Sequence, residues 1–135
     1  MTHPVLAVRA AVLARLQADV PLVALLGGPR IHDTPPRGAE PPFLTFGETT
    51  AKAWPGAPGG LRHTLTLVAW SRQPGDAEAL AMLERCEVAL AELPATLDSH
   101  RLVLLATAGV DLPRPGGQGP RRAVLRLTAL TEAAP

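Results

Sequence analysis

Apolar residues near the start of the chain recur with the spacing of an α-helix. From Pro4 to Gln17, valines and leucines return every three or four positions, and both arginines of this stretch fall outside the apolar stripe. The pattern predicts an amphipathic helix. A second, shorter helix is expected from Val20 to Leu26, because Asp19 can cap its first turn and two glycines follow its last residue.

Further along the chain, the pattern changes to the two-residue period of a β-strand. In residues 61–70, and again in 121–131, apolar side chains alternate with a mixed set of polar and apolar ones. Both segments are predicted to be strands with one buried face. Strands are also expected over 43–50 and 100–110, where apolar and β-branched residues are bounded by turn-forming or proline- and glycine-rich stretches.

One more helix is predicted between the second and third of these strands. Asp76 is a suitable N-cap, and an apolar stripe then continues to about Leu93, where Pro94 stops the helix. The stretch 29–42 holds five prolines and is expected to be extended connection, because each proline removes a backbone donor.

The predicted order is therefore two helices, two strands, one helix and two strands. Two loops, 51–60 and 111–120, connect the strands within each pair. Both are short enough for a hairpin and too short for a usual parallel crossover, which needs a dozen or more residues. We expect an α+β fold with a mostly antiparallel four-stranded sheet and its helices packed on one face. Because no repeat or second boundary is visible, a single domain over 1–135 is expected.

Composition and charge exclude several classes of protein. The formal net charge of the 135-residue chain is +1, whereas non-specific nucleic-acid binding needs several clustered cations. The start of the chain lacks the basic and apolar segments of a secretory signal, and no apolar run reaches the roughly 20 residues of a membrane span. We expect a protein that is made and folded in the cytoplasm and has no membrane partner.

No set of side chains in the sequence is arranged for catalysis. The junction after Trp70, where a strand turns into a helix, lacks an acid, a base and a nucleophile together, so scaffolding is the favoured interpretation. The stretch "PGGQGPRR" lacks the ending of a phosphate loop and leads into a strand. Cys86 falls on the buried stripe of the third helix and is expected to be inert. We predict no enzyme and no cofactor.

A metal site is not expected either. The single cysteine excludes a multi-cysteine zinc site, and the histidines are scattered without the i, i+4 spacing that presents two rings to one metal. The four histidines are His3, His32, His63 and His100.

Two tryptophans and three arginines are the candidates for contacts with other proteins. Trp54 lies in a loop rich in glycine and proline, where it can either fold back on the edge of the sheet or anchor an interface. Trp70, at a strand end, leaves the same two interpretations open. Arginine is also enriched at interfaces, so the candidate assembly residues are Trp54, Trp70, Arg114, Arg121 and Arg122.

Several segments together resemble a family of small phage proteins. The chain closely resembles the tail-completion proteins of long-tailed phages and gene transfer agents, in patterns of fold rather than of chemistry. The resemblance spans nearly the whole chain. It is carried by "AVLARLQADVPLVALLGGPRIHDTPPRGAEPPFLTFGE", by "HTLTLVAWSR" followed by "GDAEA", by "HRLVLLATAGVDL" and by "RRAVLRLTALTE".

The resemblance implies a structural virion protein, the tail terminator. Such a subunit forms a ring, expected to be hexameric, on the last disc of the tail tube, stops tube polymerisation and receives the neck proteins of the head. The implied partners are other copies of the chain, the tail tube protein and the head–tail connector or stopper proteins. DNA would pass through the ring without sequence-specific binding. The implied location is the tail and neck of the particle, after a stage in the host cytoplasm.

Physical features of the sequence agree with this hypothesis. An open antiparallel sheet has edges that ring neighbours can cover, and the loops 51–60 and 111–120 are arms that can order on contact. Two alternatives remain. One is a neck stopper or connector of the same particle. The other is a small cellular ligand-binding or hydrolytic α+β domain, which requires a concave pocket with convergent polar groups.

Overall fold

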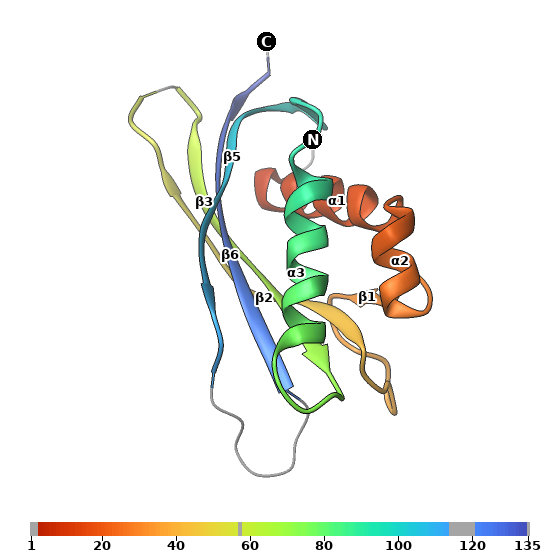
Figure 1. Cartoon of the computed structure of the whole chain (residues 1–135). Helices are drawn as coiled ribbons and strands as arrows, with labels where there is room; N and C mark the ends of the chain where they lie inside the picture. Colours follow the sequence, from red (N-terminus) through yellow and green to blue (C-terminus); the bar gives the residue numbers. More distant parts are fainter. Residues whose placement is uncertain (1–2, 57, 114–120, 135) are drawn as a thin grey trace.

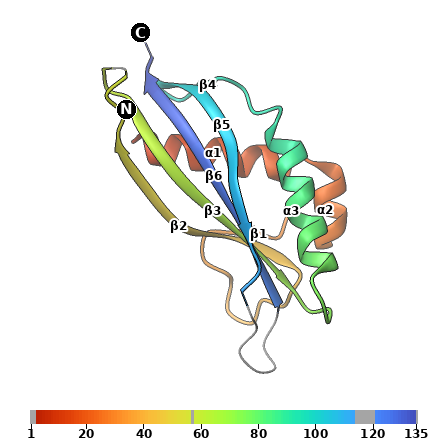
Figure 2. The same ribbon diagram turned by 60° about the vertical axis from the view of Figure 1, so that its left-hand side comes forward.

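The computed structural model describes residues 3–56, 58–113 and 121–134, and the fold is α+β, as predicted. Three helices lie together on one face of a curled six-stranded sheet (Figure 1), and the turned view shows the same arrangement (Figure 2). The elements are α1 (Pro4–Gln17), α2 (Val20–Leu26), β1 (Ile31–His32), β2 (Phe43–Ala53), β3 (Leu61–Ser71), α3 (Ala77–Leu90), β4 (Thr96–Leu97), β5 (His100–Asp111) and β6 (Arg121–Ala133).

Four long strands form the body of the sheet. They lie in the order β2-β3-β6-β5, and each runs antiparallel to its neighbours. Two short strands extend the sheet: β1 pairs in parallel with Leu44 and Thr45, and β4 pairs antiparallel with the start of β5. The expected four-stranded, mostly antiparallel sheet is thus corrected to a six-stranded mixed sheet. Strands of two residues have no measurable period, so the sequence pattern could not reveal them.

The first hairpin is tighter than the predicted loop. β2 continues to Ala53 and β3 begins at Leu61, so the turn takes only residues 54–60 of the expected loop 51–60. The Trp54 backbone N–H donates to the Gly60 carbonyl at 2.9 Å and closes the turn. Most of the other expected loop, 111–120, lies outside the described residues.

The core lies between the helices and one face of the sheet. The predicted alternation is confirmed on β3 and β6, where the helix-facing positions are buried and most side chains of the opposite face are half-buried. Each Leu side chain moved fully out of water contributes about 1.5–3 kcal/mol. The fully enclosed leucines therefore hold the helices against the sheet. They are Leu16, Leu22, Leu26, Leu44, Leu65, Leu67, Leu83 and Leu125.

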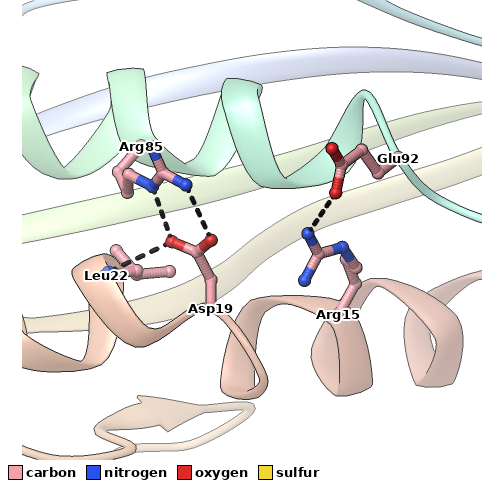
Figure 3. Close-up of polar contacts among 5 residues, drawn as sticks. All are labelled: Arg15, Asp19, Leu22, Arg85 and Glu92. Atoms are coloured by element: carbon pink, nitrogen blue, oxygen red, sulfur yellow. Dashed lines mark hydrogen bonds and ion pairs between the residues drawn. The ribbon is translucent and has the colours of Figure 1, made fainter.

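Asp19 ties the three helices to one another (Figure 3). Its carboxylate accepts from the Leu22 backbone N–H at 3.1 Å and so caps α2, as predicted. The same carboxylate accepts from Arg85 on α3, at 2.7 Å from Nε and 3.0 Å from the terminal nitrogen. Arg85 lowers the pKa of Asp19 below its usual value, although burial acts in the opposite direction. One buried carboxylate thereby fixes the α1–α2 corner against α3.

Two substitutions separate the cap of α2 from the ion pair. Asp19→Asn keeps an oxygen for the Leu22 N–H but loses the charge that pairs with Arg85, whereas Asp19→Ala loses both. We expect both variants to have a lower free energy of unfolding than the wild type. The value for Asp19→Ala should be about 1 kcal/mol below that for Asp19→Asn, because this is the usual contribution of an N-cap. Urea titrations at pH 7 measure the difference.

The matched control breaks a second ion pair, in which Arg15 of α1 donates to the exposed Glu92, just after the end of α3, at 2.8 Å. Glu92→Gln should change stability by less than about 1 kcal/mol. Because the pKa of Asp19 is lowered from 3.8, the contribution of the Asp19–Arg85 ion pair to the free energy of unfolding should be complete above pH 3.8 and should be lost as the pH falls through the lowered pKa. An Asp19→Ala variant as stable as Glu92→Gln would contradict this role.

His63 is a polar group inside the core. It is 1% exposed on β3, and its Nε2 lies 3.0 Å from the Thr131 hydroxyl on β6. Its Nδ1 has no hydrogen-bond partner in the part of the chain that the structure describes. Burial lowers the pKa of His63, and the neighbouring His100 and His3 lower it further. The folded protein therefore favours the neutral ring.

Stability should consequently fall in mild acid. In the unfolded chain His63 binds a proton at about pH 6.5, whereas in the folded chain it does so only at lower pH. The contribution of the neutral His63 to the free energy of unfolding is therefore complete above pH 6.5 and is lost as the pH falls toward the lowered pKa. His63→Leu cannot protonate and should flatten the slope of unfolding free energy between pH 7 and 5. If wild type and His63→Leu showed the same slope of unfolding free energy against pH, His63 would not be the source of the acid sensitivity.

Candidate functional site

The three helices leave the other face of the sheet uncovered (Figure 2). This open face consists of the outward-pointing side chains of β2, β3, β6 and β5. Cross-strand pairing puts Thr50, Thr64, Thr128 and Ala106 in one row across it. Threonine and arginine side chains dominate its middle, which suits a solvated or contact surface rather than a core.

An aromatic cluster occupies one end of the open face. The Trp70 ring stacks on Phe43, with centroids 6.1 Å apart and an interplanar angle of 30°. Its Nε1 donates to the Thr45 hydroxyl at 3.0 Å. The Arg122 guanidinium lies 5.8 Å from the centre of the Trp70 ring, within the range of a cation–π contact. The sheet register thus brings together Trp70 and Arg122, two of the candidate assembly residues.

A shallow groove of about 490 Å³ runs beside this cluster. It begins where a bulge between Phe46 and Thr49 curls β2, and Gly47 leaves room there, because a Cβ at that position would lie 3.0 Å from the Thr66 Cγ2. Arg126 and Asp111 form an ion pair across it at 2.8 Å. The lining residues are Gly47, Glu48, Thr50, Thr64, Thr66, Val68, Asp111, Pro113, Arg122, Val124 and Arg126.

The other candidate assembly residues lie elsewhere. Trp54 is half-buried at the β2–β3 turn, at the opposite end of β3 from Trp70, and its ring lies against Gly56 of its own turn. Arg121 points to the start of α3, where it meets Asp76 at 3.4 Å. Arg114 lies outside the described residues. The five residues therefore do not form one site.

The side-chain contacts at the junction after Trp70 stabilise a turn, which agrees with the interpretation of this junction as scaffold. The Ser71 hydroxyl donates to Glu78 at 2.7 Å and accepts from the Gln73 backbone N–H at 3.1 Å, which builds the turn into α3. Burial raises the pKa of the Cys86 thiol to about 12, so it is the buried core thiol that the sequence predicted. Across residues 3–56, 58–113 and 121–134, no cluster of three or more histidine, cysteine, aspartate or glutamate side chains could hold a metal.

One feature that sequence reasoning missed is the outer edge of β5. Val103, Leu104 and Val110 are each more than 40% exposed there, and the segment 102–110 contains no charged residue and no proline. The missing charges were a readable signal, because exposed edge strands usually carry them. Among the described helices, none is long and apolar enough to cross a membrane.

A family model described as tail completion protein gp17 matches residues 10–132, which is most of the chain, from within α1 to the last residues of β6. The chain belongs to this family. Membership gives it a structural role in phage tail completion. The resemblance noted in the sequence is thereby confirmed, and the alternative of an unrelated cellular domain loses its support. No curated protein matches the chain significantly.

Two solved structures have the same fold. One is a chain of the virion of a native gene transfer agent particle, with a TM-score of 0.77 and 23% identity, covering 98% of this chain and 100% of that chain. The other is the gp17 protein of bacteriophage SPP1, with a TM-score of 0.60 and 15% identity, covering 91% of this chain and 87% of that chain. At these identities the likeness establishes the architecture alone.

The aromatic cluster leads to a prediction about stability. Trp70→Ala removes the stack on Phe43 and leaves the Thr45 hydroxyl without its donor, so we expect a loss of about 1–2 kcal/mol in the free energy of unfolding. Trp54→Ala is the control, because that ring lies against its own turn, and it should cost less than about 1 kcal/mol. Guanidinium titrations compare the two variants. A larger loss for Trp54→Ala would contradict the assignment of the two rings.

Proposed function

We propose that this protein is a tail terminator. Copies of the chain close into a hexameric ring on the end of the tail tube, where the ring stops tube growth and receives the neck proteins of the head. The match of the gp17 family model over residues 10–132 carries the proposal. The subunit folds in the host cytoplasm and then becomes part of the particle.

The shape of the subunit supports a role in assembly. Its helices cover one face of the sheet, and the open face, the outer edge of β5 and most of the outer edge of β2 stay available to partners. In a ring, each copy offers two different surfaces to its two neighbours. A subunit with two dissimilar free flanks meets this requirement without rearranging its core.

The open face is suited to a channel through which DNA passes. Two of its arginines are already matched by acidic side chains: Arg126 pairs with Asp111 at 2.8 Å, and Arg101 pairs with Glu132. A surface that holds DNA firmly needs several unpaired cations acting together. A ring lined by this face would therefore let DNA pass without sequence-specific binding.

The candidate contact residues follow from this arrangement. Trp70 and Arg122 form the exposed end of the aromatic cluster and are proposed to contact the tube or the neck. Trp54, at the β2–β3 turn, and Arg121, at the start of β6, are proposed as further contacts at the two ends of the subunit. Arg114 is proposed as a contact from the sequence. The tube protein and the head–tail connector or stopper are the partners expected there.

Deleting the gene from a particle-producing strain tests the proposal. Without a terminator the tube has no stop, so electron micrographs should show tails of irregular and excessive length without heads. Supplying the wild-type gene on a plasmid should restore normal particles. Tails of normal length that lack heads would assign the chain to the neck stopper or connector instead, and normal particles would contradict both functions.

A further inference from the structure

The outer edge of β5 is an open backbone edge. β4 pairs only with Arg101 and His100, and one further bond runs from the Leu102 N–H to the Ala95 carbonyl at 2.7 Å. Within the described ranges, no strand lies beyond this point against the outer side of residues 103–111. The N–H and C=O groups that point outward there can accept a further strand.

The side chains on this edge do not protect it. Natural sheets discourage pairing between molecules with lysine, proline or inward-pointing charges on their edge strands. Residues 103–110 have none of these, and Val103, Leu104 and Val110 are 44%, 46% and 42% exposed. Two bulges, between Leu102 and Leu104 and between Thr107 and Gly109, limit regular pairing to short stretches and so restrict the register of a partner strand.

The opposite edge of the same sheet is also open. β1 covers β2 only at Leu44 and Thr45, and in the part of the chain that the structure describes nothing pairs with the outer side of residues 47–53. Glu48 and Lys52 are charged residues on this edge, and Thr49, Thr50 and Ala51 between them provide an uncharged, β-compatible stretch. The sheet therefore ends in two free and different edges.

The strand order decides how these two edges would meet. Four long strands alternate in direction from β2 to β5, so β2 and β5 run in opposite directions (Figure 1). When copies are related by rotation about an axis along the strands, β5 of one copy faces β2 of the next in antiparallel orientation. An odd number of strands would have produced a parallel junction. The even number lets one antiparallel sheet continue from copy to copy.

Apolar side chains of the helix layer lie beside both free edges. Next to β5, a shallow groove between α3 and the strand is lined by Leu90, Ala91 and Leu105, and Val88 of α3 is 48% exposed. On the β2 side, a groove of about 640 Å³ lies along α1 and reaches from Phe46 of β2 to Leu97 of β4, and Leu6 in its lining is 58% exposed. Joining the edges would bring these apolar flanks toward each other and remove part of them from water.

We propose that β5 of each copy pairs antiparallel with β2 of the next copy, residues 104–110 against residues 49–53, so that the ring contains one continuous sheet. This inference rests on the ring proposed above and specifies how its subunits join. The occupant of the β5 edge is thus a second copy of the chain, not the tail tube or neck protein.

Disulfide cross-linking within assembled particles tests the pairing. Ala106→Cys is combined, one position at a time, with cysteines at residues 49–53. Within one chain, β5 and β2 are separated by β3 and β6, about 14 Å at the usual strand spacing, whereas a disulfide needs Cα atoms within about 7 Å. Any bond must therefore join two copies. The native Cys86 is buried and should stay silent.

We expect a ladder of cross-linked multimers on non-reducing gels that peaks at one β2 position. The matched control combines Ala106→Cys with Val20→Cys, because Val20 is 77% exposed on α2, and this pair should give no ladder. A second test uses charge: Leu104→Lys should raise the protein concentration needed for ring formation at least about tenfold, while Val20→Lys should not change it.

The outcomes separate the two proposals. Particles that hold a ring of this protein at the head–tail junction but give no cross-link at any of residues 49–53 would overturn the edge pairing and leave the terminator function intact. Particles without the protein at the junction would overturn the terminator function, and the edge pairing would fall with it.

Discussion

The unpaired outer edges of the sheet are the constraint on which this structure depends. Backbone N–H and C=O groups need hydrogen-bond partners. On a strand edge without charged side chains, little prevents another strand from pairing with these groups. β4 covers two residues of β5, and β1 covers two residues of β2. Among the described residues, long segments at both ends of the sheet therefore have no strand partner on their outer side, and these segments are the natural place for a structural subunit to join its neighbours.

A rigid subunit makes such joining geometrically specific. The core is built from leucine, alanine and valine on one face of the sheet, and the aromatic content is only 3%. The buried Asp19 carboxylate, shared between the α2 cap and Arg85 of α3, fixes the helices in one arrangement (Figure 3). Because the helices are held to one face, the open face and the free edges keep a constant shape for partners to match.

The sequence predicts the regular elements well because their periods are long enough to measure. The helices from Pro4 and Val20, and the alternation along β3 and β6, follow directly from the spacing of apolar residues. β1 and β4 escape prediction, since two residues carry no period and Ile31 lies within a proline-rich stretch. The family could be recognised from the sequence because the segments that resemble it are spread over residues 11–132 and include parts of every long helix and strand.

The candidate site was only partly predictable, because register and curvature are tertiary properties. Trp70 and Arg122 meet through the pairing of β3 with β6, and no local pattern shows that Phe43 completes the cluster. Trp54 looked similar to Trp70 in sequence but lies at the other end of the sheet. The uncharged run of β5 was visible in the sequence, yet only the strand order reveals that it forms an edge.

Hydrogen exchange measured on the free subunit and on the assembled ring tests the central claim most directly. If neighbouring copies fill the free edges, the outward-pointing amides within 103–111 and 47–53 should exchange quickly in the free subunit, and a subset of them in each segment should become strongly protected on assembly. The account is contradicted if assembly leaves both segments unprotected and the new protection falls only on the helices.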